Sequence, residues 1–164
     1  MHTSRAATYA ENHVTLGTFE VGERVLAIDV AQMREVVRWQ PVTPLPNAPA
    51  LIEGVVDLRG SVIPVVDLGR ALGGEPIQPD LSTRIVVTEV DGLVMGLVVE
   101  AAVEVLPVEV SRMEDPPPLA TQTGYDAIRA VVRQPDAEPI LLLSLDHLLE
   151  SVYRSALGSG GGEA

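Results

Sequence analysis

Apolar residues occur along this chain in short runs, and most of the runs show the two-residue alternation of a strand. Val14 and Leu16 alternate with polar neighbours, and after a turn at Gly22-Glu23 the run at 24–29 reads as a returning strand. Side chains point to the same face at every second residue of a strand, so this alternation predicts half-buried β structure. The pattern therefore predicts that the ordered part of the chain begins with a β-hairpin.

Two further hairpins are predicted from dipeptides that suit tight turns. Arg59-Gly60 lies between apolar runs at 54–58 and 62–68, and Asp91-Gly92 lies between runs at 84–90 and 93–99. A two-residue hairpin loop of type I′ needs positive φ at both central residues, which Asp-Gly tolerates well. More strands are expected at 102–106, with an extension to 110, at 127–133 and at 140–144.

The segment after the first hairpin is predicted to be a short helix. Asp29 can cap it, and its apolar positions fall on one helical face: Val30, Met33, Val36 and Val37. Prolines then recur between residues 40 and 50. Because proline fixes φ and lacks an amide donor, we expect an extended, ordered loop in that stretch.

Two more helical segments complete the predicted elements. One is a single turn at 68–72, ended by Gly73-Gly74, and the other is an amphipathic helix at 145–153. Many short strands with few short helices are typical of a β-barrel or sandwich, so we predict a mostly β fold. The predicted organisation is a flexible leader at 1–12, one domain at 13–156 with a linker near 74–82, and a flexible Gly-rich tail at 157–164.

Composition narrows the classes of function. Hydrophobic residues make up 46% of the chain but aromatic residues only 3%, so the core must consist of Val, Leu, Ile and Ala. The formal net charge is −12, and all 11 basic residues are Arg, which disfavours binding to nucleic acid or to an anionic membrane. The chain has no cysteine, which excludes disulfides and thiolate metal sites and is compatible with the cytoplasm.

Sequence signatures of catalysis and metal binding are missing, so we predict no catalytic residue, metal ligand or cofactor. His2, His13 and His147 lack metal-ligand spacing, and no nucleophile elbow, Walker loop or dinucleotide fingerprint occurs. Asp57 and Asp67 flank predicted strands, where capping a turn is the commoner role of an acid. A small β-barrel enzyme or ligand-binding barrel remains an alternative, which predicts a deep pocket with convergent titratable groups.

Arg59 stands at the end of a predicted hairpin, between two apolar strands. A guanidinium held at such a place presents a planar fork of donors that suits recognition of a carboxylate. The plainer interpretation is an ordinary surface arginine in a turn.

Several segments match the pattern of one known family in order and in spacing. They are Ala27-Ile28-Asp29-Val30, Glu35-Val36, Pro44-Leu45-Pro46-Asn47-Ala48-Pro49, Gly54-Val55-Val56-Asp57-Leu58-Arg59-Gly60 and Ile63-Pro64-Val65-Val66-Asp67-Leu68. Together with the segments at 94–106 and 140–149, they resemble the CheW-like domain over about residues 13–153. Asp57 departs from the pattern, because the family usually has Asn at this position.

The resemblance implies two small SH3-like β-subbarrels that share a hydrophobic core, with a few short helices. It also implies a cytoplasmic, non-enzymatic adaptor without a cofactor, recruited to receptor arrays at the inner face of the membrane and not an obligate oligomer. Its partners would be the cytoplasmic tip of chemoreceptors and the regulatory domain of a CheA-type histidine kinase. A CheW-like module of a related pathway, in pilus motility or cyclic-dinucleotide signalling, is the alternative within the family.

The family's receptor-binding groove corresponds to five positions of this chain: Met33, Glu35, Val36, Gly54 and Arg59. For Met33 and Val36, packing in the core is an equally good interpretation. The kinase contact corresponds to Gly60, Asp67, Asp91 and Gly92. An acid and an arginine at matching motif positions lead to the hypothesis that Glu35 pairs with Arg59 and holds the hairpin against the predicted helix. Asp57 adds a negative charge beside Arg59.

Overall fold

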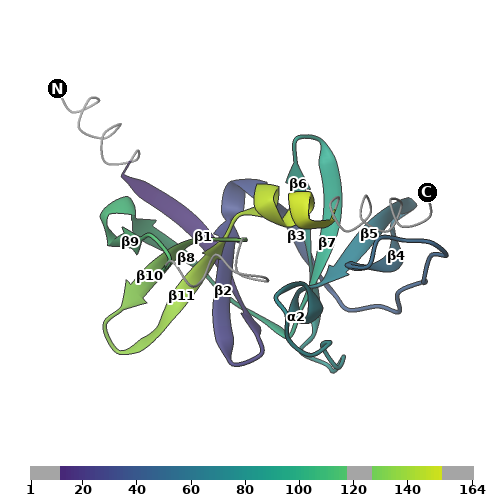
Figure 1. Ribbon diagram of the computed structural model, residues 1–164, viewed down its shortest axis with the longest axis horizontal. Helices are drawn as coiled ribbons and strands as arrows, with labels where there is room; N and C mark the ends of the chain where they lie inside the picture. The colour runs from purple at the N-terminus through teal and green to yellow at the C-terminus, as the bar shows by residue number, and fades with distance from the viewer. Residues whose placement is uncertain (1–11, 118–126, 153–164) are drawn as a thin grey trace.

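The computed structural model describes residues 12–117 and 127–152, and these residues form two β-sheets that lie side by side (Figure 1). Sheet A runs in the order β8 (Ala101–Glu109), β1 (His13–Val21), β2 (Arg24–Asp29), β11 (Ala137–Leu143), β10 (Ile128–Gln134) and β9 (Met113–Glu114). Sheet B runs in the order β3 (Met33–Arg38), β6 (Arg84–Val90), β7 (Leu93–Val99), β5 (Ser61–Asp67) and β4 (Ile52–Leu58). The predicted mostly β architecture of paired subbarrels is confirmed.

The chain passes from sheet A to sheet B and back again. It builds β1 and β2, then all of sheet B, and then returns through β8 to finish sheet A. The segment 74–82 connects α2 (Leu68–Ala71) to β6, so it joins two elements on the sheet B side rather than joining the two sheets. The crossings between the sheets instead follow Asp29 and Val99.

A shared core joins the two sheets, as the resemblance implied. One cluster of buried side chains combines Phe19, Leu26 and Ile28 of sheet A with strand residues of sheet B and with the helix at 145–152. A second cluster lies within sheet A and includes Leu16, Ala27 and Leu142. Neighbours such as Leu26 and Ala27 enter different clusters because successive strand residues point to opposite faces. Figure 1 shows the C-terminal helix, in yellow, above the junction of the two sheets.

The hairpin turns occur where the sequence predicts them. Strands β4 and β5 are joined at Arg59-Gly60, and β6 and β7 are joined at Asp91-Gly92. All four residues have positive φ, as a type I′ turn requires: 52° and 88° in the first turn, 52° and 82° in the second. The dipeptides therefore form the turns that their sequences favour.

The predicted helix after Asp29 is wrong. Only a single 3₁₀ turn, η1 (Val30–Gln32), follows Asp29, and β3 begins directly afterwards. Asp29 does cap this turn, because its carboxylate accepts a hydrogen bond from the Ala31 amide at 2.9 Å. The exposure alternates strictly along β3, and the adjacent β-branched Val36 and Val37 suit a pleated strand better than a helix.

The other predicted helices are confirmed within the described residues. The turn expected at 68–72 is α2, and residues 145–152 are helical, whereas Tyr153 lies outside the described residues. The predicted leader falls almost wholly outside them, and the predicted Gly-rich tail falls wholly outside. No helix in the described part of the chain combines the length and the apolar character needed to cross a bilayer.

Candidate docking surface around the Arg59 turn

Arg59 adopts a left-handed backbone conformation at the tip of the β4–β5 hairpin. A non-glycine residue pays about 1–2 kcal/mol for positive φ, so its neighbours must stabilise the turn. Asp57 does so, because its Oδ1 accepts a hydrogen bond from the Gly60 amide at 2.8 Å. The turn that carries Arg59 is thereby fixed by its own preceding strand.

The side chain of Arg59 pairs with Glu35. Its Nη2 donates to Oε2 of Glu35 on β3, so the pairing hypothesis is confirmed, although Glu35 belongs to a strand and not to a helix. The Arg59 side chain remains 70% exposed and that of Glu35 33% exposed. An arginine has five N–H donors, so this fork still offers donors to a partner while the pair fixes its direction.

The Glu35–Arg59 pair bridges the two edges of sheet B. Strands β3 and β4 are the edge strands of this sheet. After β3 the chain runs alongside β4: the Gln40 side chain donates to the Asp57 carbonyl at 3.1 Å, and Thr43 forms two backbone hydrogen bonds of 2.9 Å with Val55. The pair therefore lies at a seam where the sheet closes on itself, and it presents both charges at the surface.

Gly54 has a packing reason to be glycine. A Cβ atom added there would lie 2.1 Å from the carbonyl oxygen of Thr43 and 2.7 Å from its carbonyl carbon. Backbone atoms cannot move aside as a flexible side chain can, so a larger residue would push Thr43 away from β4. Gly54 is buried and shapes the base of the surface rather than forming its exposed part.

Met33 and Val36 separate in the structure. Met33 is partly buried and packs against the shared core, with its Cε so near Gly17 that a Cβ added there would lie 2.3 Å away. Val36 is 40% exposed, and it lies on the more exposed face of β3, opposite the face of Met33 and Glu35. Of the two interpretations left open for these residues, core packing fits Met33, and a surface position fits Val36.

Asp57 contributes to the turn and not to an ion pair with Arg59. Its carboxylate accepts the Gly60 amide, and its carbonyl accepts the Gln40 side chain. An Asn side chain carries the same Oδ1 acceptor, so the residue usual in the family would make the same turn contact. Relative to an Asn, Asp57 adds a charge next to Arg59 and holds the turn by the same contact.

The residues predicted for kinase contact divide into two groups. Gly60, Asp91 and Gly92 are exposed, and the parallel pairing of β5 with β7 places both turns at the same end of sheet B. Asp67 is only 6% exposed, and its carboxylate accepts the Arg70 amide at 3.3 Å and the Ile77 amide at 2.9 Å. Asp67 thus holds α2 and the segment that follows it, and its charge is not presented to a partner.

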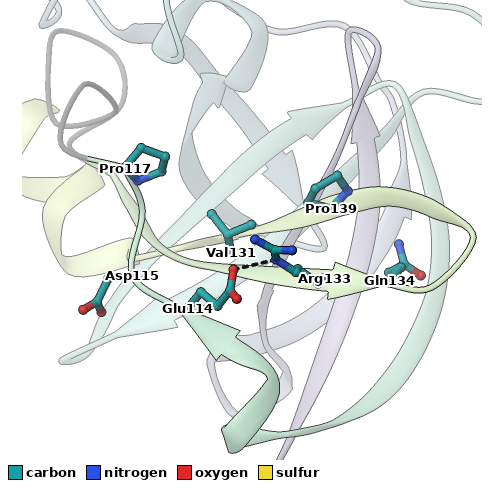
Figure 2. Close-up of a pocket in the computed structure, with 7 residues that line it drawn as sticks. All are labelled: Glu114, Asp115, Pro117, Val131, Arg133, Gln134 and Pro139. Atoms are coloured by element: carbon teal, nitrogen blue, oxygen red, sulfur yellow. Dashed lines mark hydrogen bonds and ion pairs between the residues drawn. The ribbon is translucent and has the colours of Figure 1, made fainter.

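A hollow of about 370 Å³ lies at the β9 edge of sheet A, next to β9, β10 and β11. Figure 2 shows Pro117 and Pro139 around it, Val131 at its centre, and Asp115 turned away. The Nε of Arg133 donates to Oε2 of Glu114 at 2.8 Å, and both side chains are half exposed or more. These groups give the hollow an ion pair and apolar walls.

Within residues 12–117 and 127–152 no three His, Asp or Glu side chains gather as a metal site would need.

Another Arg–Glu pair, which the sequence did not indicate, lies at the opposite end of β4 from Arg59. Arg70 in α2 pairs with Glu53 at the start of β4 and also donates to the Ala50 carbonyl. No short motif contains both residues, so their proximity depends on the hairpin and the helix that follows it. Only the pairing of β4 with β5 brings them together.

Comparisons with known proteins agree on one family. The family model of the CheW-like domain matches residues 15–153. The chemotaxis protein CheW of Rhizobium meliloti (strain 1021) is 33% identical over 154 residues, which cover 91% of this chain and 99% of that protein. The probable chemotaxis protein CheW of Rhizobium etli is 30% identical over 138 residues, which cover 84% of this chain and 88% of that protein. The crystal structure of the scaffolding protein TtCheW from Thermoanaerobacter tengcongensis is similar with a TM-score of 0.75 and 31% identity, over 84% of this chain and 92% of that one.

Proposed function

The chain belongs to the CheW-like domain family, and on this premise we propose that it is an adaptor that couples chemoreceptors to a CheA-type histidine kinase. It acts in the cytoplasm, by binding the cytoplasmic tip of a receptor and the regulatory domain of the kinase. Coupling of this kind requires two docking surfaces held by one rigid scaffold. It requires no catalytic residue and no cofactor.

The observation that carries the proposal is the geometry of Arg59. Its side chain is 70% exposed, yet its backbone is fixed in a tight turn and its guanidinium is directed by Glu35. A preorganised charged fork loses little conformational entropy when a partner carboxylate binds. The combination of a fixed turn and an ion pair distinguishes Arg59 from Arg133, which has an ion pair but lies within a strand.

We assign the receptor-binding surface to the accessible pair Glu35 and Arg59 and to Val36, which is exposed next to Glu35 on the other face of the edge strand β3. Met33 and Gly54 support this surface, because the Met33 side chain anchors the start of β3 in the core and Gly54 lets Thr43 lie against β4. The kinase contact is assigned to the exposed turns at Gly60 and at Asp91-Gly92. Asp67 is left out of this contact, because its carboxylate is buried and bonded internally.

Co-sedimentation with a receptor fragment and a CheA-type kinase tests the proposal. The wild-type protein should enter the pellet with both partners and raise kinase activity in the pellet. Arg59→Glu should lose receptor-dependent sedimentation, because it places a carboxylate beside Glu35 and reverses the charge offered to the partner.

Arg129→Glu is the matched control. Arg129 is an exposed arginine on β10 in sheet A, and its reversal changes the net charge by the same amount. Sedimentation of this variant should equal that of the wild type. Wild-type protein that stays in the supernatant with both partners present would contradict the proposed function. Equal loss in both variants would show a general charge effect and would remove Arg59 from the site.

A further inference from the structure

Arg70 makes two different contacts with one guanidinium. Its Nη1 donates to Oε1 of Glu53, and its Nη2 donates to the carbonyl oxygen of Ala50 at 3.1 Å. A planar fork that bonds a side chain and a backbone carbonyl fixes both of them relative to its own helix. These contacts, which we call the Arg70 clasp, tie α2 to the start of β4 and to the end of the loop before it.

The loop at 44–51 is attached to the rest of the molecule at both ends. At its start, the backbone amide and carbonyl of Thr43 form hydrogen bonds of 2.9 Å each with Val55. At its end, the Ile52 amide donates to the Pro49 carbonyl at 2.9 Å. Because β4 is an edge strand, its only strand partner is β5, and the single Thr43–Val55 bridge pairs its outer side. The Arg70 clasp adds an attachment from a different element, α2, to a segment that is otherwise held by the Thr43–Val55 bridge, by the local Pro49–Ile52 hydrogen bond and by the packing of Leu51 against the core.

The same loop presents an exposed apolar side chain. Leu45 is 45% exposed and is flanked by Pro44 and Pro46, which restrict the backbone on both sides. It lies two residues after Thr43, so it is within about 7 Å of the backbone that rests on Gly54. An apolar anchor on an ordered loop binds better than one on a loose loop, because less entropy is lost on binding.

We propose that Arg70 is a positioning residue of the receptor-binding surface. It does not contact the receptor; it orders the loop at 44–51 and the start of β4, so that Leu45 is held near Gly54, at the end of the surface away from Arg59. This inference rests on the proposed function for its partner, but the ordering of the loop can be measured without any partner.

Amide hydrogen exchange and two separate affinities test the inference. In Arg70→Ala, exchange should rise about tenfold at the amides of Thr43, Ile52 and Val55, which report on the two ends of the loop. Affinity for the receptor fragment should fall about tenfold, whereas affinity for the kinase regulatory domain should stay within twofold of wild type. A purely structural role would weaken both affinities together, so the split identifies positioning.

Two further variants keep the test sharp. Glu53→Gln removes the ion pair but leaves the Ala50 contact, so it should give a smaller rise in exchange at the same amides. Arg112→Ala is the matched control, because Arg112 also donates to a backbone carbonyl, that of Arg133, at 2.7 Å in sheet A. It should leave exchange at the three amides and receptor affinity unchanged.

Each outcome has a definite meaning. Unchanged exchange in Arg70→Ala would overturn the inference, even if receptor affinity fell, because Arg70 would then act by direct contact. Raised exchange with unchanged receptor affinity would also overturn it, since the loop would not belong to the surface. Failure of the wild-type protein to bind the receptor fragment is a failure of the proposed function, and the exchange data would then still show whether Arg70 orders the loop.

Discussion

The turns at Arg59-Gly60 and at Asp91-Gly92 have the same backbone geometry and opposite chemistry. The φ values of the first residue are both 52°, and those of the glycines are 88° and 82°. Asp-Gly is a dipeptide that suits this turn, because Asp tolerates positive φ. Arg has no such preference, so the β4–β5 turn uses a residue that costs stability where the β6–β7 turn does not.

The two turns also differ in the contacts that hold them. Arg59 is held by Glu35 across the seam, and its turn is capped by Asp57 through the Gly60 amide. Asp91 lies in a hairpin whose seven-residue strands pair in register from Val90↔Leu93 to Arg84↔Val99. If the proposed function holds, the β6–β7 turn serves the fold, whereas the β4–β5 turn also presents a side chain and has added contacts that offset its strain.

The largest effect is expected when the two turns are given the same sequence. Arg59→Asp should preserve the fold and change the free energy of unfolding by less than about 1 kcal/mol, because Asp tolerates the positive φ of this turn. Affinity for the receptor fragment, measured by calorimetry, should fall about 30-fold or more, as for loss of an arginine at the centre of an interface. The reciprocal variant Asp91→Arg should keep receptor binding. A receptor affinity of Arg59→Asp equal to wild type would mean that the turn serves only the fold.

The second effect concerns the glycines, which should behave alike in the two turns. A Cβ added at Gly60 or at Gly92 meets no atom within 4 Å, so only the positive φ opposes the substitution. Gly60→Ala and Gly92→Ala should therefore each lower the free energy of unfolding by about 1–2 kcal/mol. Urea denaturation measures both values. A difference above about 1 kcal/mol would show that the turns are not equivalent scaffolds.

The sequence predicted the geometry of these turns because a turn depends on two adjacent residues and the runs beside them. The strands at 84–90 and 93–99 were predicted with their observed bounds. The segment at 33–38 was predicted wrongly, because its apolar residues fit a helical face as well as a strand. Only its pairing with β6, far along the chain, decides between the two.

The candidate site was predictable only where a motif carries it. Arg59 and Glu35 occupy motif positions, and the structure brings them together. Arg70, Glu53 and Thr43 lie outside these motifs. Their contacts could not be predicted, because they depend on how α2 and the loop at 39–51 lie against β4. Burial was also hidden from the sequence: Asp67 reads as a strand-end acid of the same kind as Asp57, yet one is buried and the other is exposed.

The third prediction concerns the cap that distinguishes the Arg59 turn. Asp57→Ala removes the acceptor of the Gly60 amide and should lower the free energy of unfolding by about 1 kcal/mol. Asp57→Asn keeps Oδ1 and should change it by only a few tenths of a kcal/mol. Chemical denaturation of the two variants gives the comparison. Equal losses would assign the effect to the charge of Asp57 and not to its hydrogen bond.

The smallest effect on stability is expected for Glu35→Gln, although its effect on binding should be clear. The Arg59–Glu35 pair is exposed, and an exposed ion pair contributes about 0.2–1 kcal/mol that salt screens. The free energy of unfolding should therefore fall by about 0.5 kcal/mol at low salt and by less in about 1 M salt.

The matched control for this last variant is Glu114→Gln, which removes the negative charge from the exposed pair with Arg133 in sheet A. Both variants should lose similar stability, because the energy of an exposed pair depends little on where it lies. Receptor affinity should fall only in Glu35→Gln, because only there is the charge attraction that directs the Arg59 guanidinium removed. If the two variants bind the receptor equally, Glu35 does not direct Arg59, and the strained turn alone must account for the placement of the side chain.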